Sequence, residues 1–189
     1  MGKSKIKTIT HNGIEFPSQT EALMYCWCEE AKALGLIESF EMQKEYEIYP
    51  TVRYTVEKPL KTKIKHVERV LLNRWTYTSD FEIVALRGLN GLIERGTWYR
   101  IQGNWNYTCD AKGDRINPNQ ASAFSHKQKG LYHMRGVYVN KCQPSTFYPA
   151  NGFPLTVPEA CYKKTGSGLY KYWQDIKNKC PTIEEAYSL

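Results

Sequence analysis

Hydrophobic and polar positions repeat with two different periods along the chain, and the period identifies the local structure. The first regular stretch has apolar residues at helical spacing, which form the buried stripe of a helix: Leu23, Trp27, Ala31 and Leu34. Ser18, followed three residues later by Glu21, is a capping-box pattern, and Gly35 is a natural stop. The sequence therefore predicts a first helix that opens at Ser18 and ends before Gly35.

Alternation with period two follows this helix and predicts strands. Residues 40–49 alternate with one wet face, and residues 74–86 alternate with Tyr77 and Phe81 on one face and Asp80 on the other. Residues 92–101 and 105–111 predict two further strands, joined by a hairpin turn at Gly103 and Asn104. Residues 50–65 show little periodicity and are interpreted as an exposed basic loop or a short irregular hairpin.

A second long helix is predicted over residues 120–135, and Gly136 ends it. Its predicted inner side holds five residues: Ala121, Phe124, Gln128, Leu131 and Met134. One more strand follows over residues 137–141, and residues 182–187 predict a final helical turn. Strands and helices in this order indicate a mixed α/β (α+β) fold with a sheet that is mostly a meander.

Composition is compatible with one ordinary globular domain over residues 1–189. A hydrophobic fraction of 41% argues against intrinsic disorder, and no apolar run is long enough to cross a bilayer. The charged start lacks the apolar run of a signal peptide, so we expect a cytoplasmic protein with no membrane partner. The formal charge of +7 suits a polyanion such as DNA, although charge alone fits a solvated basic surface equally well.

The six cysteines do not have the spacing of a metal site, because the chain contains no Cys-x-x-Cys pair. Cys26 and Cys28 are about 200° apart on a helix of 3.6 residues per turn. We therefore expect reduced, mostly buried thiols.

The candidate chemistry centres on Asp110 and Lys112, which end an apolar, aromatic strand. Residues two apart on a strand share a face, so this carboxylate and this ammonium can address one phosphate. Asp80 supplies a second carboxylate from another strand, and Glu21 a third if its helix packs against the strand edge. Oxygen ligands of this kind suit Mg²⁺ or Mn²⁺, and the carbonyl of Ala111 could add another oxygen. These residues predict a metal-dependent phosphodiesterase that holds one or two ions.

Each of these residues also has a simpler local explanation. Glu21 can be only the partner of Ser18 in the helix cap, which its local sequence favours. Asp80 can be an exposed strand residue or start a turn, and residues 110–114 can be a polar loop. The order of the motifs along the chain, rather than any single triplet, distinguishes these readings.

That order resembles the PD-(D/E)XK nuclease superfamily, above all small phage-encoded endonuclease-like proteins related to Holliday-junction resolvases. The similarity covers roughly residues 14–141, and residues 142–189 form a C-terminal extension. The matching segments are Phe16-Pro17-Ser18-Gln19-Thr20-Glu21, Gly35-Leu36-Ile37, Glu41-Met42-Gln43-Lys44, Tyr77-Thr78-Ser79-Asp80-Phe81, Asp110-Ala111-Lys112-Gly113 and Phe124-Ser125-His126-Lys127-Gln128-Lys129. The interval from Asp80 to Asp110 is longer than is usual in the superfamily, which indicates an extra hairpin over residues 92–105.

The resemblance implies a restriction-endonuclease-like core, in which a mixed central sheet is flanked by helices. It further implies Glu21, Asp80 and Asp110 as catalytic metal ligands and Lys112 as the catalytic lysine. The same resemblance assigns DNA contacts to Gln43, Lys127 and Lys129. No organic cofactor is expected.

The leading functional hypothesis is a structure-selective endodeoxyribonuclease that acts on branched DNA, in phage DNA recombination or processing. Symmetric cleavage of a junction needs two active sites, so a homodimer would follow, located in the host cytoplasm if the protein is phage-encoded. Two alternatives stay open: a non-catalytic DNA-binding protein that retains the nuclease fold, and a basic protein-interaction scaffold.

Overall fold

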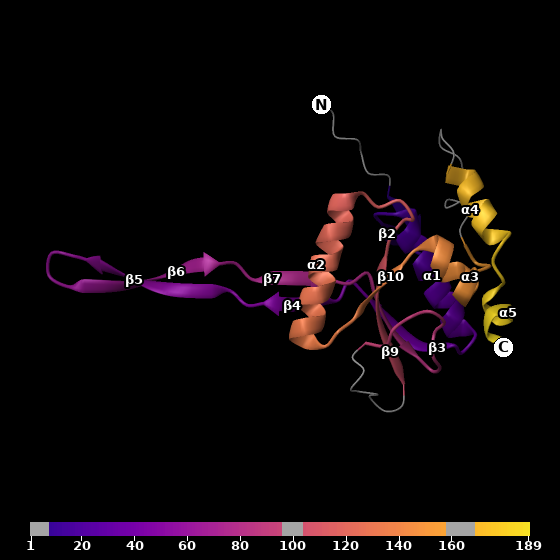
Figure 1. The fold of residues 1–189 in the computed structure, drawn as a ribbon, viewed down its shortest axis with the longest axis horizontal. Helices are drawn as coiled ribbons and strands as arrows, with labels where there is room; N and C mark the ends of the chain where they lie inside the picture. Colours follow the sequence, from indigo (N-terminus) through magenta and orange to yellow (C-terminus); the bar gives the residue numbers. More distant parts are fainter. Residues whose placement is uncertain (1–7, 96–103, 158–168) are drawn as a thin grey trace.

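The computed structural model describes residues 8–95, 104–157 and 169–189, and Figure 1 shows how their elements are arranged. The strands are β1 (Ile9–His11), β2 (Ile14–Phe16), β3 (Ile37–Met42), β4 (Glu45–Tyr49), β5 (Val52–Pro59), β6 (Ile64–Leu72), β7 (Trp75–Thr78), β8 (Phe81–Ala85), β9 (Trp105–Ala111) and β10 (Val139–Cys142). The helices are α1 (Gln19–Ala33), α2 (Pro118–Arg135), α3 (Pro144–Asn151), α4 (Leu169–Lys177) and α5 (Ile183–Tyr187).

The central sheet has four strands in the order β10-β9-β8-β3. Strands β3, β8 and β9 run antiparallel, whereas β10 runs parallel to β9. Because β10 returns through α2, it meets β9 in the same direction, with Lys141 beside Asp110. The fold is therefore mixed α+β with a mixed central sheet flanked by helices, which confirms that part of the prediction.

Helix α1 lies between the central sheet and the C-terminal helices (Figure 1). Ser18 caps it, and Gly35 follows it with φ of +71°, as the sequence predicts. Leu23, Trp27 and Ala31 are buried as expected, and Leu34 is half-buried. Ala22, Met24, Tyr25, Cys26 and Cys28 are also buried, because α3, α4 and α5 cover the side of α1 that faces away from the sheet. The predicted buried stripe was therefore too narrow, because other elements pack against α1 on two of its sides.

Two predicted strands are each broken in two, and the breaks lie beside each other. Residues 40–49 form β3 and β4, which are separated at Gln43, whose φ is +56°. Residues 74–86 form β7 and β8, separated at Ser79 and Asp80. The N–H of Ser79 donates to the carbonyl of Lys44 at 2.9 Å, and the N–H of Gln43 donates to the carbonyl of Asp80 at 3.3 Å. The paired breaks separate β4 and β7 from the central sheet as a two-stranded sheet of their own.

Residues 50–65 belong to a long regular hairpin, so the prediction of a loop or a short irregular hairpin was wrong. β5 and β6 pair in antiparallel register over eight residue pairs from Val52–Leu72 to Pro59–Ile64. The hairpin projects from the body of the protein as a thin arm (Figure 1). Nearly all its residues are exposed on both faces, so the alternation of apolar and polar residues that marks a half-buried strand is missing.

The predicted extra hairpin between the two aspartate strands is only partly within the described residues. Strand β9 forms with the predicted bounds. Residues 92–95, the described part of its predicted partner, form no strand, and the N–H of Arg95 donates to the carbonyl of Asn106 at 2.6 Å. Residues 96–103, which include Gly103 of the predicted turn, lie outside the described residues.

Helix α2 is confirmed, starts two residues before its predicted start, and ends at Gly136 with φ of +65°. Phe124 and Gln128 are half-buried and Leu131 is buried, but Ala121 and Met134 of the predicted inner side are exposed. The helix packs on β4 and β7 through its middle: a Cβ on Gly130 would lie 3.3 Å from Ile48. The ends of α2 therefore extend beyond the surface that it covers.

The tail holds three helices, of which the sequence predicted only the last. Thr182 and Glu185 form a capping box at the start of α5. Cys26, Cys28, Cys109 and Cys142 are buried and Cys180 is half-buried; none of these described thiols forms a disulfide, while Cys161 lies outside the described residues. In the part of the chain that the structure describes, no helix has the length and apolar character needed to span a bilayer.

Candidate active site

A cavity of about 480 Å³ lies where the start of α1, the Ser79–Asp80 break, the end of β9 and the side of α2 meet. Glu21, Asp80, Asp110, Ala111 and Lys112 all line it. The other lining residues are Ser18, Thr20, Tyr77, Thr78, Gly113, Arg115, Ile116, Gln120, Ala123, Phe124 and Lys127. Four elements distant in sequence therefore bring the predicted acids and the predicted lysine to one place.

Asp110 and Lys112 lie side by side at the end of β9, as their spacing predicts. Lys112 Nζ is 2.7 Å from Asp110 Oδ1 and 3.7 Å from Asp80 Oδ2. Burial disfavours the charged ammonium, but the attraction of Asp110, Asp80 and Glu21 outweighs it and raises the pKa of Lys112. Lys112 is therefore a fixed positive charge between the two aspartates.

Asp80 is fixed by the backbone of the Asp110 strand. Its Oδ2 accepts a hydrogen bond from the N–H of Ala111 at 2.8 Å. Burial, and then the neighbouring Asp110 carboxyl, raise the pKa of Asp80 to about 8, although Lys112 acts in the opposite direction. In the metal-free site Asp80 therefore keeps its proton at neutral pH, and a cation bound there would displace that proton.

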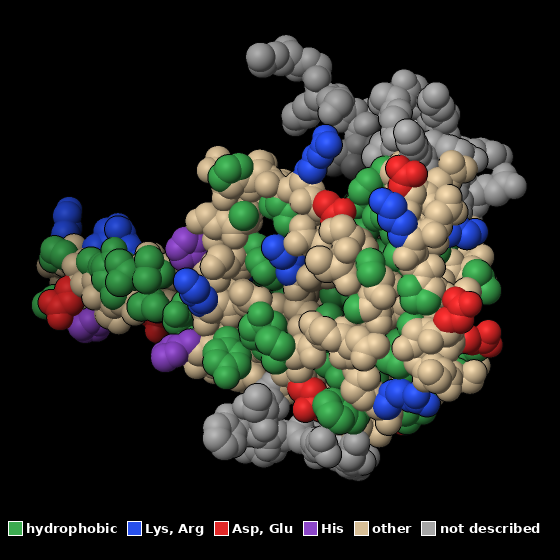
Figure 2. Space-filling model, turned by 45° about the vertical axis from the view of Figure 1, so that its right-hand side comes forward, with side chains coloured by type: hydrophobic (Ala, Val, Ile, Leu, Met, Phe, Trp, Pro, Cys, Tyr) green, Lys and Arg blue, Asp and Glu red, His purple; other side chains and the backbone are tan. Residues whose placement is uncertain are grey.

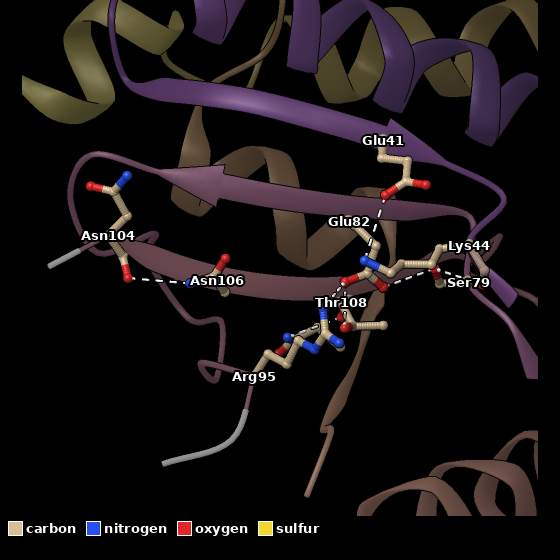
Figure 3. Close-up of polar contacts among 9 residues, drawn as sticks. Glu41, Lys44, Ser79, Glu82, Arg95, Asn104, Asn106 and Thr108 are labelled. Carbon is tan, nitrogen blue, oxygen red and sulfur yellow. Dashed lines mark hydrogen bonds and ion pairs between the residues drawn. The ribbon is translucent and has the colours of Figure 1, made fainter. Parts of the chain in front are cut away.

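A buried polar network braces the break that presents Asp80 (Figure 3). Glu82, only 6% exposed, accepts hydrogen bonds from Ser79 Oγ at 2.9 Å, Thr108 Oγ1 at 3.0 Å and Arg95 Nη1 at 3.0 Å. Ser79 precedes Asp80, and Thr108 lies two residues before Asp110, so one carboxylate ties both aspartate segments together. The sequence pattern does not reveal this role, because the alternation of residues 74–86 places Glu82 on the polar face of its strand.

Glu21 has both of the roles that its sequence allows, in the helix cap and at the cavity. Ser18 Oγ donates to Glu21 Oε1 at 2.9 Å, and the N–H of Glu21 donates to Ser18 Oγ at 3.2 Å, so Glu21 belongs to the helix cap. It also lines the cavity, where burial raises its pKa while Ser18 and Lys112 act to lower it. The cap fixes the carboxylate at the rim of the cavity.

The donors fit a hard divalent cation at the two aspartates. Within the described ranges, no three His, Cys, Asp or Glu side chains are grouped closely enough to hold a metal ion, so Glu21 does not stand beside both aspartates. Asp80 and Asp110 offer carboxylate oxygens, and a cation would supply the positive charge that takes the place of the proton on Asp80. Ala111, whose carbonyl is a predicted ligand, lines the cavity. Water and a substrate phosphate would fill the other positions, as is common for Mg²⁺.

Tyr77 also lines the cavity, although it was not among the predicted site residues. Its alternation placed it on the face opposite Asp80, but the break between β7 and β8 turns both residues toward the same cavity. Its hydroxyl is buried and has no hydrogen-bond partner among the described residues. Burial and the neighbouring Asp110 and Asp80 raise the pKa of Tyr77, so the hydroxyl stays protonated and can donate to a ligand.

The three predicted DNA-contacting residues are not all at the cavity. Lys127 lines it from α2, and so do two residues that were not predicted: Gln120, also on α2, and Arg115, which lies before that helix. Lys129 is exposed elsewhere on α2, since residues two apart on a helix point in different directions. Gln43 is exposed at the break between β3 and β4, where its backbone contacts Asp80.

The C-terminal extension braces two sides of the cavity. Trp173 Nε1 on α4 donates to Gln19 Oε1 at 3.0 Å, at the start of α1. The neighbouring Tyr172 hydroxyl donates to Asp114, two residues after Lys112. Asp114 also accepts from Ser145 Oγ at 2.8 Å. The extension thereby fixes the helix start that carries Glu21 and the loop that follows the Asp-x-Lys motif.

No family model, curated protein or solved structure matches the chain. The likeness to PD-(D/E)XK nucleases therefore stays a prediction from the motifs. The chemistry of the cavity supplies the further grounds for a function.

Proposed function

We propose that the protein is a metal-dependent endodeoxyribonuclease. The observation that carries the proposal is the convergence of Asp80 and Asp110 on Lys112 in an open cavity, with Lys112 Nζ within 4 Å of both carboxylates. Two neighbouring carboxyl groups do not favour binding of an anion such as phosphate on their own, but they can bind it through a cation held between them.

Each residue of the cavity has its own role in the proposed hydrolysis of a phosphodiester bond. Asp80 and Asp110 would hold Mg²⁺ or Mn²⁺, and Glu21 at the rim is suited to binding through water. The ion, when bound, polarises the scissile phosphate and activates water. Lys112 stabilises the negative charge that grows on the phosphate oxygens, and the Tyr77 hydroxyl can donate to one of them. Lys127 and Arg115 bind the adjoining backbone.

A structure-selective activity on branched DNA, with two copies of the chain acting together, is the finer form of the proposal. Its support is the resemblance of the motifs to resolvase-like proteins. The three cations that line the cavity, Lys112, Arg115 and Lys127, suit contacts to phosphates, which carry no sequence information directly. This composition fits recognition of backbone shape.

The test is incubation of the protein with labelled four-way junction, linear duplex and single-stranded DNA in Mn²⁺, Mg²⁺ or EDTA. Cleavage that requires either cation, and is fastest on the junction, is the expected result. Cleavage of the linear duplex at the same rate would remove the structure-selective part and leave the nuclease. Binding of DNA with no cleavage in either cation would instead favour a non-catalytic DNA-binding protein.

A further inference from the structure

The arm, defined as residues 52–72 of β5, β6 and their turn, has no hydrophobic core of its own. Val56 and Val67 are its only half-buried residues, and they lie opposite each other. An isolated two-stranded hairpin is marginally stable in water. A ribbon of this length that projects from the protein is therefore suited to a partner that covers one of its faces.

The two faces of the arm differ in charge. Register and alternation place Tyr54, Val56 and Lys58 of β5 on one face with their partners Arg69, Val67 and Lys65 of β6. We call this the basic face. It carries three cations and no acid, and no ion pair to these cations is formed by the described residues.

The opposite face holds Glu57, Glu68 and one cation, Arg53. His66 Nδ1 lies 3.9 Å from Glu57 on that face. Lys and Arg side chains gather along one edge of the arm, whereas acidic side chains lie at the opposite edge (Figure 2). Like charges directly across a strand pair are destabilising, so the Lys58–Lys65 pair costs stability until an anion lies against it.

The arm leads along the chain into the strand that precedes Asp80. β6 leads into β7, and β7 ends at Thr78, two residues before Asp80. Nine residues of β6 span about 30 Å at about 3.3 Å per residue, close to one turn of B-DNA at about 34 Å. The arm is therefore long enough to follow about one further turn of a duplex bound at the cavity.

We infer that the basic face of the arm binds the phosphate backbone of duplex DNA that flanks the cavity. The partner follows from the charges: three cations with no acid among them, and Tyr54 as the only aromatic, are suited to phosphates rather than to base edges. Lys61 and Lys63 in the turn extend the same positive charge to the tip. The inference rests on the proposed function only in that both take DNA as the partner.

The test measures binding in EDTA, where no hydrolysis takes place. Lys58→Gln/Lys65→Gln is compared with Lys32→Gln/Lys179→Gln, which removes the same charge from exposed positions away from the arm and the cavity. On a duplex of about three turns, the arm variant is expected to bind about tenfold more weakly than the control at about 0.1 M salt. The slope of log affinity against log salt should fall by about 2.

Two further measurements make the result specific. Lys58→Arg/Lys65→Arg should restore the affinity and the salt slope, and on a duplex of about one turn the arm variant and the control should differ little. Equal affinity and equal slope of the arm variant and the control on the longer duplex would overturn the inference. So would a wild-type dimer that the arm variant converts to a monomer with an unchanged slope, because the arm would then bind a second copy.

The outcome separates this inference from the proposed function. If the wild type binds DNA through the arm but cuts no DNA in Mn²⁺, the arm inference stands and hydrolysis fails. If the wild type cuts DNA and the arm variant binds like the control, hydrolysis stands and the arm inference fails.

Discussion

The carboxylate of Asp80 accepts a hydrogen bond from the backbone N–H of Ala111 at 2.8 Å. This contact ties the break after β7 to the last residue of β9, which lies between Asp110 and Lys112. This hydrogen bond joins segments 31 residues apart, and the bonds of Glu82 to Ser79 and Thr108 tie the same two segments together.

Asp80 should make the metal-free protein less stable as the pH rises. Its folded pKa of about 8 is above the ordinary value of 3.8, so the folded state binds more protons between these pH values. The free energy of unfolding should fall between about pH 4 and pH 8, by at most about 1.4 kcal/mol per pH unit. Asp80→Asn keeps an acceptor for Ala111 and should flatten this dependence in urea unfolding at pH 5, 6.5 and 8 in EDTA. If the free energy of unfolding depends on pH in the same way in the wild type and in Asp80→Asn, the raised pKa of Asp80 is contradicted.

Mg²⁺ or Mn²⁺ should stabilise the wild type, because a cation would take the place of the proton on Asp80 and would bind only the folded site. Thermal unfolding should show a rise in Tm with metal concentration and a larger rise at pH 8 than at pH 5.5. Asp80→Asn and Asp110→Asn should lose most of the rise, whereas Asp175→Asn on the exposed side of α4 should keep it. A rise of the same size in all four proteins would place the metal elsewhere.

Lys112→Gln should reduce the rate of DNA cleavage by about 10²-fold, since it removes the charge that stabilises the phosphate oxygens. It should also lower stability without metal, because the ammonium no longer offsets the two carboxylates. Lys112→Arg should recover stability better than rate, since a planar guanidinium is not a compact point charge. Single-turnover cleavage and urea unfolding measure the two effects. A cleavage rate that Lys112→Gln leaves unchanged would remove the lysine from the chemistry.

Glu82→Gln should lower the free energy of unfolding by about 1–3 kcal/mol, because it leaves Arg95 without a charged partner inside the protein. The matched control is Glu41→Gln: Glu41 is the partner of Glu82 on β3, but it is exposed and forms only a 3.5 Å ion pair with Lys44. The control should change stability by less than about 1 kcal/mol. Chemical denaturation measures the free energy of unfolding of both variants. Equal losses in Glu82→Gln and Glu41→Gln would show that the network around Glu82 does not brace the break.

The local signals in the sequence predicted the elements that depend on local rules. Ser18 and Gly35 bounded α1, and the alternation of residues 105–111 predicted β9 and the shared face of Asp110 and Lys112. The breaks at Gln43 and Asp80 could not be predicted, because Gln43 adopts a positive φ without being glycine and each break is held by backbone bonds to the other. Tyr77 is buried as its alternation predicts, but the break also brings it to the same cavity as Asp80, which the alternation could not show.

Other features were hidden because their partners lie far along the chain. Glu82 is buried and accepts hydrogen bonds from Arg95 and Thr108, and a strand pattern does not identify such partners. The arm lacks a buried face, so the alternation that marks other strands is absent from it. Helices α3 and α4 form against α1, where Trp27 Nε1 donates to the carbonyl of Asn151, rather than from strong local periodicity.

The most direct test of the metal-dependent site is the single-turnover cleavage of a labelled four-way junction by the wild type and by Asp110→Asn in Mn²⁺, with Asp175→Asn as the control. DNA binding by all three proteins is measured in EDTA alongside. The account predicts cleavage by the wild type and the control, and a loss of at least about 10³-fold in Asp110→Asn with binding retained. Cleavage by Asp110→Asn at the wild-type rate would contradict it.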